Sequence, residues 1–152
     1  MEIERQLWKV CDKRRFLIST MEELAGDAHI SFEGDLSAFA LLNFADASEE
    51  ETSVLKRNTL SPRQDFVVLP LETGLATGII RAIGGTVPKT ILHIQVEKAG
   101  RLEMGLYDQF HPEATFFGPA LTAPMLDRLE SEGILRKWNV LRRMPEERRQ
   151  RV

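Results

Sequence analysis

The side chains best suited to chemistry lie within one short stretch of the sequence, GLYDQFHPEATFFG. Tyr107, Asp108, His111 and Glu113 fall within seven positions of one another. A histidine beside a carboxylate can act as a general base, because the carboxylate fixes which ring nitrogen carries the proton. An acid/base site centred on His111 is therefore one hypothesis for this stretch.

The same stretch also has the pattern of a turn at the end of a sheet. Pro112 restricts His111 to an extended or turn conformation. Successive side chains of a strand point to opposite faces, so Tyr107 and Asp108 cannot both line one pocket without a bulge. We therefore interpret the stretch as the polar edge where a sheet ends. Under the enzymatic alternative the catalytic candidates are His111, Asp108, Glu113, Tyr107 and His93.

No metal or cofactor site is predicted. The possible soft or imidazole ligands are Cys11, His29, His93 and His111, and none forms a CxxC, HxxxH or HxH pattern. The stretch AIGGTVPKT lacks both the GxxxxGK[ST] spacing of a phosphate-binding loop and the GxGxxG spacing of a dinucleotide fold. The GxSxG pattern of a serine-hydrolase elbow is also absent from the sequence.

Length and composition predict one globular domain in a reducing cytoplasm. The chain has 152 residues, of which 43% are hydrophobic and 28% charged. Its one cysteine excludes an internal disulfide. No apolar run approaches the roughly 20 residues of a membrane span, and MEIERQLWKV lacks the apolar core of a signal peptide. Neither a membrane partner nor export is expected.

Charge is divided unevenly along the chain. Residues 136–152 contain seven basic residues against Glu146 and Glu147, so this segment carries +5 within a chain of net charge −3. The preceding residues must then carry −8. We predict a single α+β domain at 1–135 and a basic tail at 136–152.

Hydrophobic periodicity predicts the first elements. Apolar residues three and four apart predict a helix over 2–25, ended by Gly26. HISFEGDLSAFALLNF predicts two strands around a turn at Glu33-Gly34-Asp35. Residues 45–64 predict a long exposed loop with a helical turn near 53–57, and DFVVLPLE a buried strand with Pro70 at its end or edge. TGLATGIIRAIGG predicts a small helix.

TILHIQVEKAGRLEMGLYD predicts a hairpin with a three-residue loop, Lys98-Ala99-Gly100. In this register Val96 faces Leu102, and the apolar residues share one face. The opposite face is expected to be at least partly wet, and it carries His93, Gln95, Glu97, Glu103 and Tyr107.

ATFFG predicts a further short strand, and LTAPMLDRLESEGILRKW a helix capped by Thr122 and ended by Gly133. The element order is thus α-ββ-β-α-ββ(β)-α. Hairpins between helices favour an α+β fold with a largely antiparallel sheet of about five to six strands, on which N-terminal, middle and C-terminal helices pack.

LTAPMLDRLESEGILRKW, followed by MPEERRQRV, resembles the recognition helix and wing of MarR-type winged-helix repressors. The resemblance covers residues 122–152 and implies a DNA-binding regulator. Basic side chains near the phosphate backbone dominate the affinity of such proteins for DNA. The residues expected to contact DNA under this alternative are Thr122, Arg128, Arg142, Arg143, Arg148 and Arg149.

The function that these patterns favour is a small non-enzymatic protein-binding module, such as an adaptor, a chaperone-like protein or an immunity-type protein. The partner is expected to be another protein, and the residues allow a homodimer without specifying one. An acidic body can steer a basic partner. Trp8 and Trp138 are the candidate partner-binding residues, because both are expected to be partly exposed and tryptophan is enriched at binding hot spots.

Overall fold

The computed structural model describes residues 6–139 of the chain. These residues form a mixed α+β fold, which confirms the predicted fold class. The helices are α1 Lys13–Leu24, α2 Ala76–Ala82 and α3 Ala123–Ser131, with short 3₁₀ helices η1 Leu41–Asn43 and η2 Pro112–Ala114. The strands are β1 Leu7–Val10, β2 Ala28–Gly34, β3 Asp65–Pro70, β4 Ile91–Lys98, β5 Arg101–Leu106, β6 Thr115–Phe117 and β7 Leu135–Trp138. None of the helices within this range is long and apolar enough to cross a bilayer.

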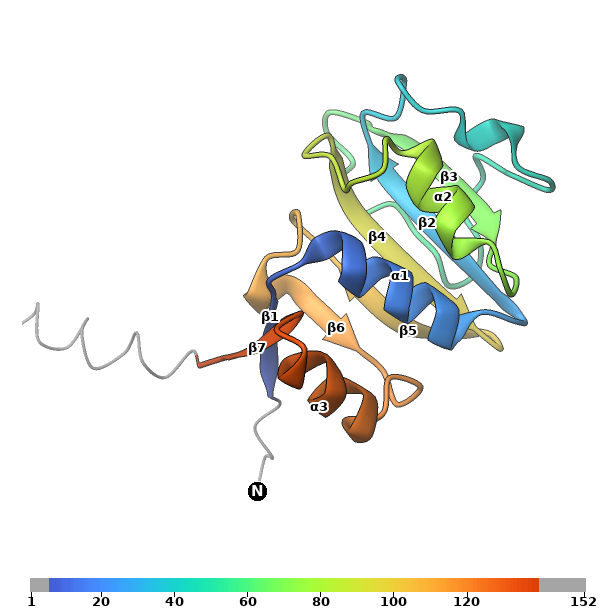
Figure 1. The fold of residues 1–152 in the computed structure, drawn as a ribbon. Coiled ribbons are helices and arrows are strands. Elements are labelled where there is room, and N and C mark those ends of the chain that lie inside the picture. The colour runs from blue at the N-terminus through green and yellow to red at the C-terminus, as the bar shows by residue number, and fades with distance from the viewer. Residues whose placement is uncertain (1–5, 140–152) are drawn as a thin grey trace, which may run out of the picture.

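Five strands form an antiparallel sheet in the order β3-β2-β4-β5-β6, and β1 and β7 form a separate two-stranded ribbon. Helices α1 and α2 cover one face of the sheet, and α3 lies beside β6 and the ribbon (Figure 1). The main core lies between the sheet and these helices. In it Ile30 opposes Val96 and Phe32 opposes Ile94, and all four side chains are buried.

The predicted N-terminal helix is correct only in its second part. The residues before it form β1, which pairs antiparallel with β7. Trp8 and Val10 are buried and alternate with half-buried neighbours, which is the two-residue period of a strand. Helix α1 begins only after Asp12, whose carboxylate accepts a hydrogen bond from the Arg15 N–H at 3.1 Å and caps it.

The predicted turn at Glu33-Gly34-Asp35 is wrong, because β2 continues through Glu33 and Gly34 and pairs with both β3 and β4. Gly34 has a φ of +152°, and a Cβ on it would lie 2.1 Å from the Thr90 carbonyl oxygen. The glycine that suggested a turn instead permits a close approach of β2 to the start of β4.

Three other predicted elements are confirmed. The strand expected in DFVVLPLE is β3, the small helix is α2 and the strand in ATFFG is β6. β3 lies at one edge of the sheet and ends at Pro70. This position suits proline, which has no N–H for a neighbouring strand.

The β4–β5 hairpin is confirmed as an element, but its predicted loop length is wrong. Lys98 pairs with Arg101, so the turn contains only Ala99 and Gly100. Both turn residues have positive φ, as the twist of a two-residue hairpin turn requires.

A bulge in β5 compensates for the shorter turn. Glu97 opposes Leu102 while Val96 opposes Met104, so Glu103 is an extra residue between two paired positions. Because of this extra residue, Met104 still faces the main core. Val96 and Met104 thus keep the predicted core-facing side. The predicted pairing of Val96 with Leu102 is wrong, because Leu102 opposes Glu97 and packs with Phe66 and Val68 on the other face of the sheet.

Residues 45–64, which we call the cover segment, contain no helix or strand, and the helical turn expected near 53–57 does not form. The expectation that the whole segment is exposed is wrong. Leu55 is fully buried and forms a second, smaller core with Phe66 and Val68. Ser48 exchanges two backbone hydrogen bonds with Val68, at 2.9 and 2.7 Å. The cover segment therefore packs on the sheet face opposite α1 and α2.

The C-terminal helix is confirmed as α3. Thr122 Oγ1 accepts a hydrogen bond from the Met125 N–H at 3.4 Å, and Gly133, with a φ of +76°, follows the last turn. The chain then forms β7, so Trp138 lies in a strand and not at the end of a helix. The fold thus extends beyond residue 135 to the end of β7.

Candidate functional site

The expected wet face of the hairpin is in fact buried beneath the cover segment. Ser31 opposes Gln95 and Glu33 opposes His93, and these four side chains are between 1% and 5% exposed. We call them, together with the half-buried Tyr107, the polar row. Buried polar groups are costly unless they are hydrogen-bonded, so their partners decide what this face can do.

Glu33 binds the backbone of the cover segment. Its carboxylate accepts hydrogen bonds from the Asn58 N–H at 2.8 Å and from the Thr59 N–H at 3.1 Å, one on each oxygen. Charge-assisted bonds of this kind are stronger than neutral ones. Glu33 therefore serves as an anchor for residues 58–59.

His93 has both ring nitrogens engaged. Nδ1 accepts a hydrogen bond from the Asp108 N–H at 3.1 Å, and Nε2 lies 2.8 Å from Thr59 Oγ1. Since Nδ1 is an acceptor, a neutral ring carries its proton on Nε2 and donates it to Thr59. His93 therefore joins the end of the hairpin to the cover segment and presents no free nitrogen to a substrate.

Gln95 and Tyr107 complete the polar row. The Gln95 amide donates to the Lys56 carbonyl at 2.8 Å, and the Tyr107 hydroxyl donates to Gln95 Oε1 at 3.2 Å. The Tyr107 ring lies over Gly105, where a Cβ would be 2.6 Å from the ring. Burial raises the pKa of the Tyr107 hydroxyl.

The cluster that the enzymatic alternative requires around His111 does not assemble. His111 is exposed, and its Nδ1 accepts a hydrogen bond from the Glu113 N–H at 3.1 Å within a turn. Asp108 contributes its backbone N–H to His93, and no contact joins its carboxylate to that ring. Tyr107 approaches His93, with ring centroids 5.8 Å apart. Of the five catalytic candidates, only His93 and Tyr107 thus belong to the polar row.

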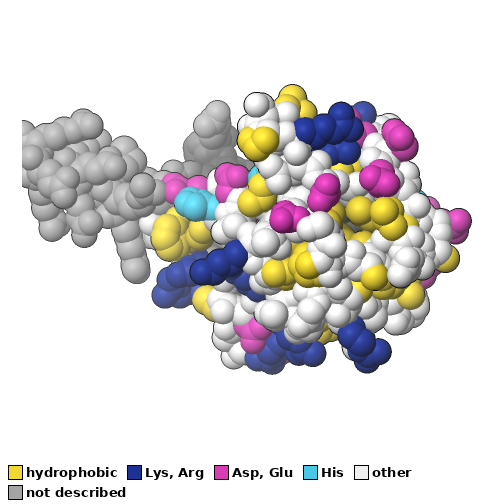
Figure 2. Space-filling model, turned by 90° about the horizontal axis from the view of Figure 1, so that it is seen from above, with side chains coloured by type: hydrophobic (Ala, Val, Ile, Leu, Met, Phe, Trp, Pro, Cys, Tyr) yellow, Lys and Arg dark blue, Asp and Glu magenta, His cyan; other side chains and the backbone are white. Residues whose placement is uncertain are grey.

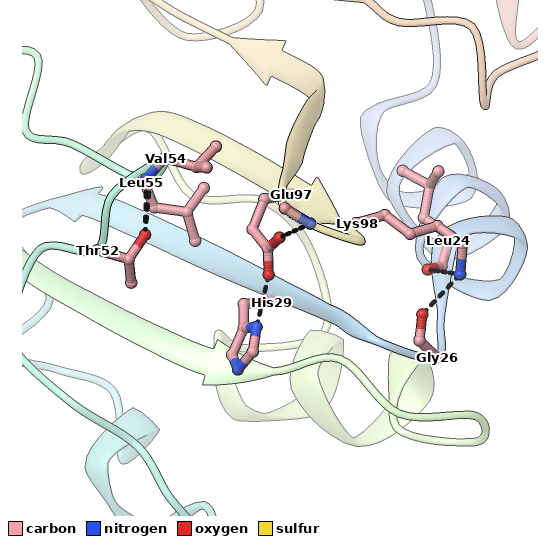
Figure 3. Close-up of polar contacts among 9 residues, drawn as sticks. Leu24, Gly26, His29, Thr52, Val54, Leu55, Glu97 and Lys98 are labelled. Atoms are coloured by element: carbon pink, nitrogen blue, oxygen red, sulfur yellow. Dashed lines mark hydrogen bonds and ion pairs between the residues drawn. The ribbon is translucent and has the colours of Figure 1, made fainter.

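A histidine–carboxylate pair that we had not predicted lies at the turn end of the sheet. His29 Nδ1 is 2.6 Å from Glu97 Oε1, and Glu97 Oε2 accepts the Gly100 N–H at 3.0 Å (Figure 3). Next to this pair, the Lys98 ammonium donates to three carbonyls at the end of α1. These contacts hold the hairpin turn to β2 and α1. Only the register of β2 against β4 could have revealed the pair.

Within residues 6–139, no group of three or more histidine, cysteine, aspartate or glutamate side chains could hold a metal ion. Cys11 is exposed and is a free thiol.

The two edge strands of the sheet, β3 and β6, differ in whether their outward backbone groups have hydrogen-bond partners. At β3 the cover segment bridges Val68, and Pro70 has no N–H to offer. At β6 the residues Thr115 and Phe117 direct their backbone groups away from β5, because Phe116 forms the bonded pair with Gly105. Neither outward N–H nor outward C=O of these two residues has a hydrogen-bond partner in the described part of the chain. β6 therefore presents an open edge.

An apolar hollow of about 170 Å³ lies beside this open edge. It is bounded by the start of β1, by β6 and by the region around α3. The residues that line it are Gln6, Leu7, Trp8, Thr115, Phe116, Phe117, Leu121 and Leu126. None of the polar row contributes to it.

The two tryptophans both belong to this end of the molecule. Trp8 lines the hollow but is only 7% exposed, so the expectation that it is partly exposed is wrong. Trp138 is half-buried and opposes Leu7 in the ribbon. Its indole N–H is buried and has no hydrogen-bond partner among the described residues.

The ribbon that borders the hollow is basic. β1 and β7 carry Lys9, Arg136 and Lys137 and no carboxylate. The charge of Lys137 is partly neutralised, because its Nζ lies 4.0 Å from Glu130 Oε1. Elsewhere charges of both signs are mixed, and on the face seen in Figure 2 they are scattered among apolar side chains.

The DNA-contact candidates are divided between the described and undescribed parts. The Thr122 hydroxyl caps α3, and Arg128 Nε is 3.6 Å from Glu132 Oε2. β6 and a turn precede α3, where a winged-helix protein has another helix. Arg142, Arg143, Arg148 and Arg149 lie outside the described residues. DNA binding by this end stays a prediction.

Comparisons with protein-family models, with curated proteins and with solved structures found no match for this chain.

Proposed function

We propose that this protein is a non-catalytic protein-binding module and that it binds its partner at the open edge of β6. The observation that carries the proposal is the pair of unpartnered backbone positions, Thr115 and Phe117, next to the apolar hollow. An exposed sheet edge is a template for another strand, and many peptide-binding domains add a ligand strand in this way.

The hydrogen bonds of the polar row also support a non-catalytic function. A general base needs a ring nitrogen within reach of a substrate, and both nitrogens of His93 are bound to the protein itself. The Glu33 carboxylate is likewise occupied by two backbone N–H groups. These residues stabilise the fold and offer no opening for an acid/base reaction.

The hollow is also the wrong size for a typical small-molecule site. Such sites usually enclose about 300–1,000 Å³. The hollow measures about 170 Å³, which suits a side chain of a bound polypeptide.

The test is a selection of binding peptides from a random display library, followed by comparison of two variants. Phe117→Pro and Phe117→Ala both remove the ring that stacks on Phe16, but only proline also removes the outward N–H. We expect the selected peptides to bind the proline variant at least about tenfold more weakly than the alanine variant, because a ladder hydrogen bond is lost. Equal binding to both variants would place the contact elsewhere and overturn the proposal.

A further inference from the structure

We infer that His93 is a pH-sensitive latch and that protonation of its ring releases the turn at residues 108–110, which leads from β5 toward β6. This inference goes beyond the proposed function and does not depend on it, because it concerns how the fold responds to acid.

The turn at residues 108–110 has an unusual backbone conformation. Asp108, Gln109 and Phe110 have φ values of 51°, 58° and 66°, so three consecutive non-glycine residues lie in the left-handed region. In this region the Cβ of an L-residue crowds the following carbonyl oxygen, and proteins use it for single residues and not for runs. Such a conformation persists only where surrounding contacts impose it. The contacts that hold this turn are therefore the points at which it can be released.

Contacts from β4 and from the main core hold the turn. The Asp108 N–H donates to His93 Nδ1 at 3.1 Å, and the Gln109 N–H donates to the Leu92 carbonyl oxygen at 2.9 Å. The Phe110 side chain is buried in the main core. Of these three contacts, the one to His93 is made by a side chain that titrates between about pH 5 and about pH 8.

Protonation of His93 reverses its contact with the turn. Nδ1 accepts the Asp108 N–H and Nε2 lies 2.8 Å from the Thr59 hydroxyl, so the ring is neutral and carries its proton on Nε2. A second proton must go to Nδ1, and both ring nitrogens are then donors. The new Nδ1–H faces the Asp108 N–H with no acceptor between them. Acid therefore replaces a hydrogen bond with a repulsion between two donors.

Glu33 offers the protonated ring a different partner. Glu33 opposes His93 across the β2–β4 ladder, and both side chains bind Thr59. A carboxylate attracts an imidazolium, and a hydrogen bond between two charged groups is stronger than one between neutral groups. A charged ring that turns away from Asp108 toward Glu33 exchanges its lost hydrogen bond for an ion pair. The latch thus has two discrete arrangements, one for each protonation state.

The other titratable groups around His93 are placed differently. Tyr107 on β5 has its ring centroid 5.8 Å from that of His93 and stays neutral below pH 10, since burial raises its pKa. Asp108 contacts the ring through its backbone N–H. In the cover segment the Arg57 guanidinium lies over an aromatic ring of the second core, at 5.0 Å, and Lys56 is exposed. The carboxylate on β2 is therefore the group toward which a charged ring turns.

Release of the turn affects the connection from β5 to β6. The His111 N–H donates to the Tyr107 carbonyl oxygen, and the Tyr107 N–H donates to the Ala114 carbonyl oxygen, both at 3.1 Å. These two bonds close around residues 108–110, so they depend on the conformation of the turn. Acid should therefore loosen this connection while β2 and β4 stay paired. The contribution of the latch is complete at the upper end of the histidine range and is lost as the pH falls.

The test follows amide hydrogen exchange in the full chain by NMR from about pH 8 to about pH 5. Protection factors are compared, because they divide out the intrinsic pH dependence of exchange, and the ring shifts of His93 report its protonation. We expect protection at Asp108 and Gln109 to fall by about tenfold or more as the ring takes up its proton. Amides in the centre of β2 and β4 should keep their protection.

Two variants assign the response to one ring. In His93→Asn the side-chain Oδ1 takes the place of Nδ1 as an acceptor and binds no proton in this range, so protection at Asp108 should not change with pH. His111→Asn is the matched control. His111 Nδ1 also accepts a backbone N–H, from Glu113 at 3.1 Å, but the ring is exposed. This variant should keep the wild-type response at Asp108.

Three results would overturn the latch. They are a protonated His93 ring with unchanged protection at Asp108, a ring that stays neutral throughout the range, and a response that persists in His93→Asn. If His93→Asn fails to fold, the wild-type protein still decides, because the ring shifts and the Asp108 amide shift must change with one common midpoint. Different midpoints would contradict the latch. None of these readouts uses a ligand of β6, so the proposed function is tested separately.

Discussion

The polar row and the β6 edge are opposite solutions to the same problem of unpaired polar groups on a sheet. On the polar row the protein supplies its own partners. The cover segment brings backbone groups of residues 56–59 to Glu33 and Gln95 and the Thr59 hydroxyl to His93. At the β6 edge the outward groups of Thr115 and Phe117 are left open beside an apolar hollow. The residues that look most reactive are therefore bound within the fold, and residues of ordinary chemistry form the edge where we propose that a partner binds.

Substitutions beneath the cover segment are expected to reduce stability, and the largest effect is expected at Leu55. Leu55→Ala should lower the free energy of unfolding by about 3 kcal/mol, because it leaves a cavity between Leu55, Phe66 and Val68. Leu60→Ala is the matched control in the same segment, since Leu60 is 77% exposed and should change stability by less than about 0.5 kcal/mol. Denaturant unfolding measures both. Similar losses in the two variants would show that the segment does not dock.

Glu33→Ala should cost about 2–3 kcal/mol, because the N–H groups of Asn58 and Thr59 lose the carboxylate that accepts their hydrogen bonds. Glu33→Gln keeps one acceptor oxygen and should lose less. Amide exchange at Asn58 and Thr59 provides the local readout and should accelerate in both variants. Unchanged exchange would contradict the role of Glu33 as an anchor.

Tyr107 gives a pH-dependent test, because it is the one tyrosine in the sequence. Burial raises its pKa in the folded state above the ordinary value of 10.0, so the folded protein retains this proton at a pH where the unfolded chain has lost it. The contribution of Tyr107 to stability is therefore complete below pH 10 and is lost as the pH rises through the folded pKa. Tyrosinate absorbance should titrate at a higher pH in native protein than in denaturant. Coincident curves would show that the ring is not buried.

The smallest change in stability is expected at the basic side chains of the β1–β7 ribbon. Reversing Lys9, Arg136 and Lys137 to glutamate should alter the free energy of unfolding by less than about 1 kcal/mol, since exposed charges contribute little. A loss comparable to that of Glu33→Ala would mean that the ribbon is structural, and the contrast between the two regions would disappear.

The sequence predicted the fold class and most elements, because hydrophobic period and capping residues act locally. Thr122 and Gly133 mark the ends of α3 as expected. The errors occurred where contacts with segments distant in the sequence determine the local structure. Residues 7–10 form a strand because they pair with β7. Glycine is needed at position 34 because a Cβ there would collide with the Thr90 carbonyl oxygen.

The candidate site was harder to predict for the same reason. The alternation of the hairpin placed His93, Gln95 and Tyr107 on one face correctly, but it could not show that a distant polar segment covers that face. The open edge of β6 depends on backbone groups, which every residue type has. No side-chain motif in ATFFG could have revealed it.

The cover segment has a consequence for how the chain folds. Thr59 lies 26 residues from Glu33 and 34 from His93, so its docking needs long loops to close and is expected late. Until then the second face of the sheet is bare. In that transient state Phe66 and Val68 are exposed on that face, beside the polar side chains of Ser31, Glu33, His93 and Gln95. We therefore expect the polar row to limit the apolar surface that the chain exposes before the cover segment docks.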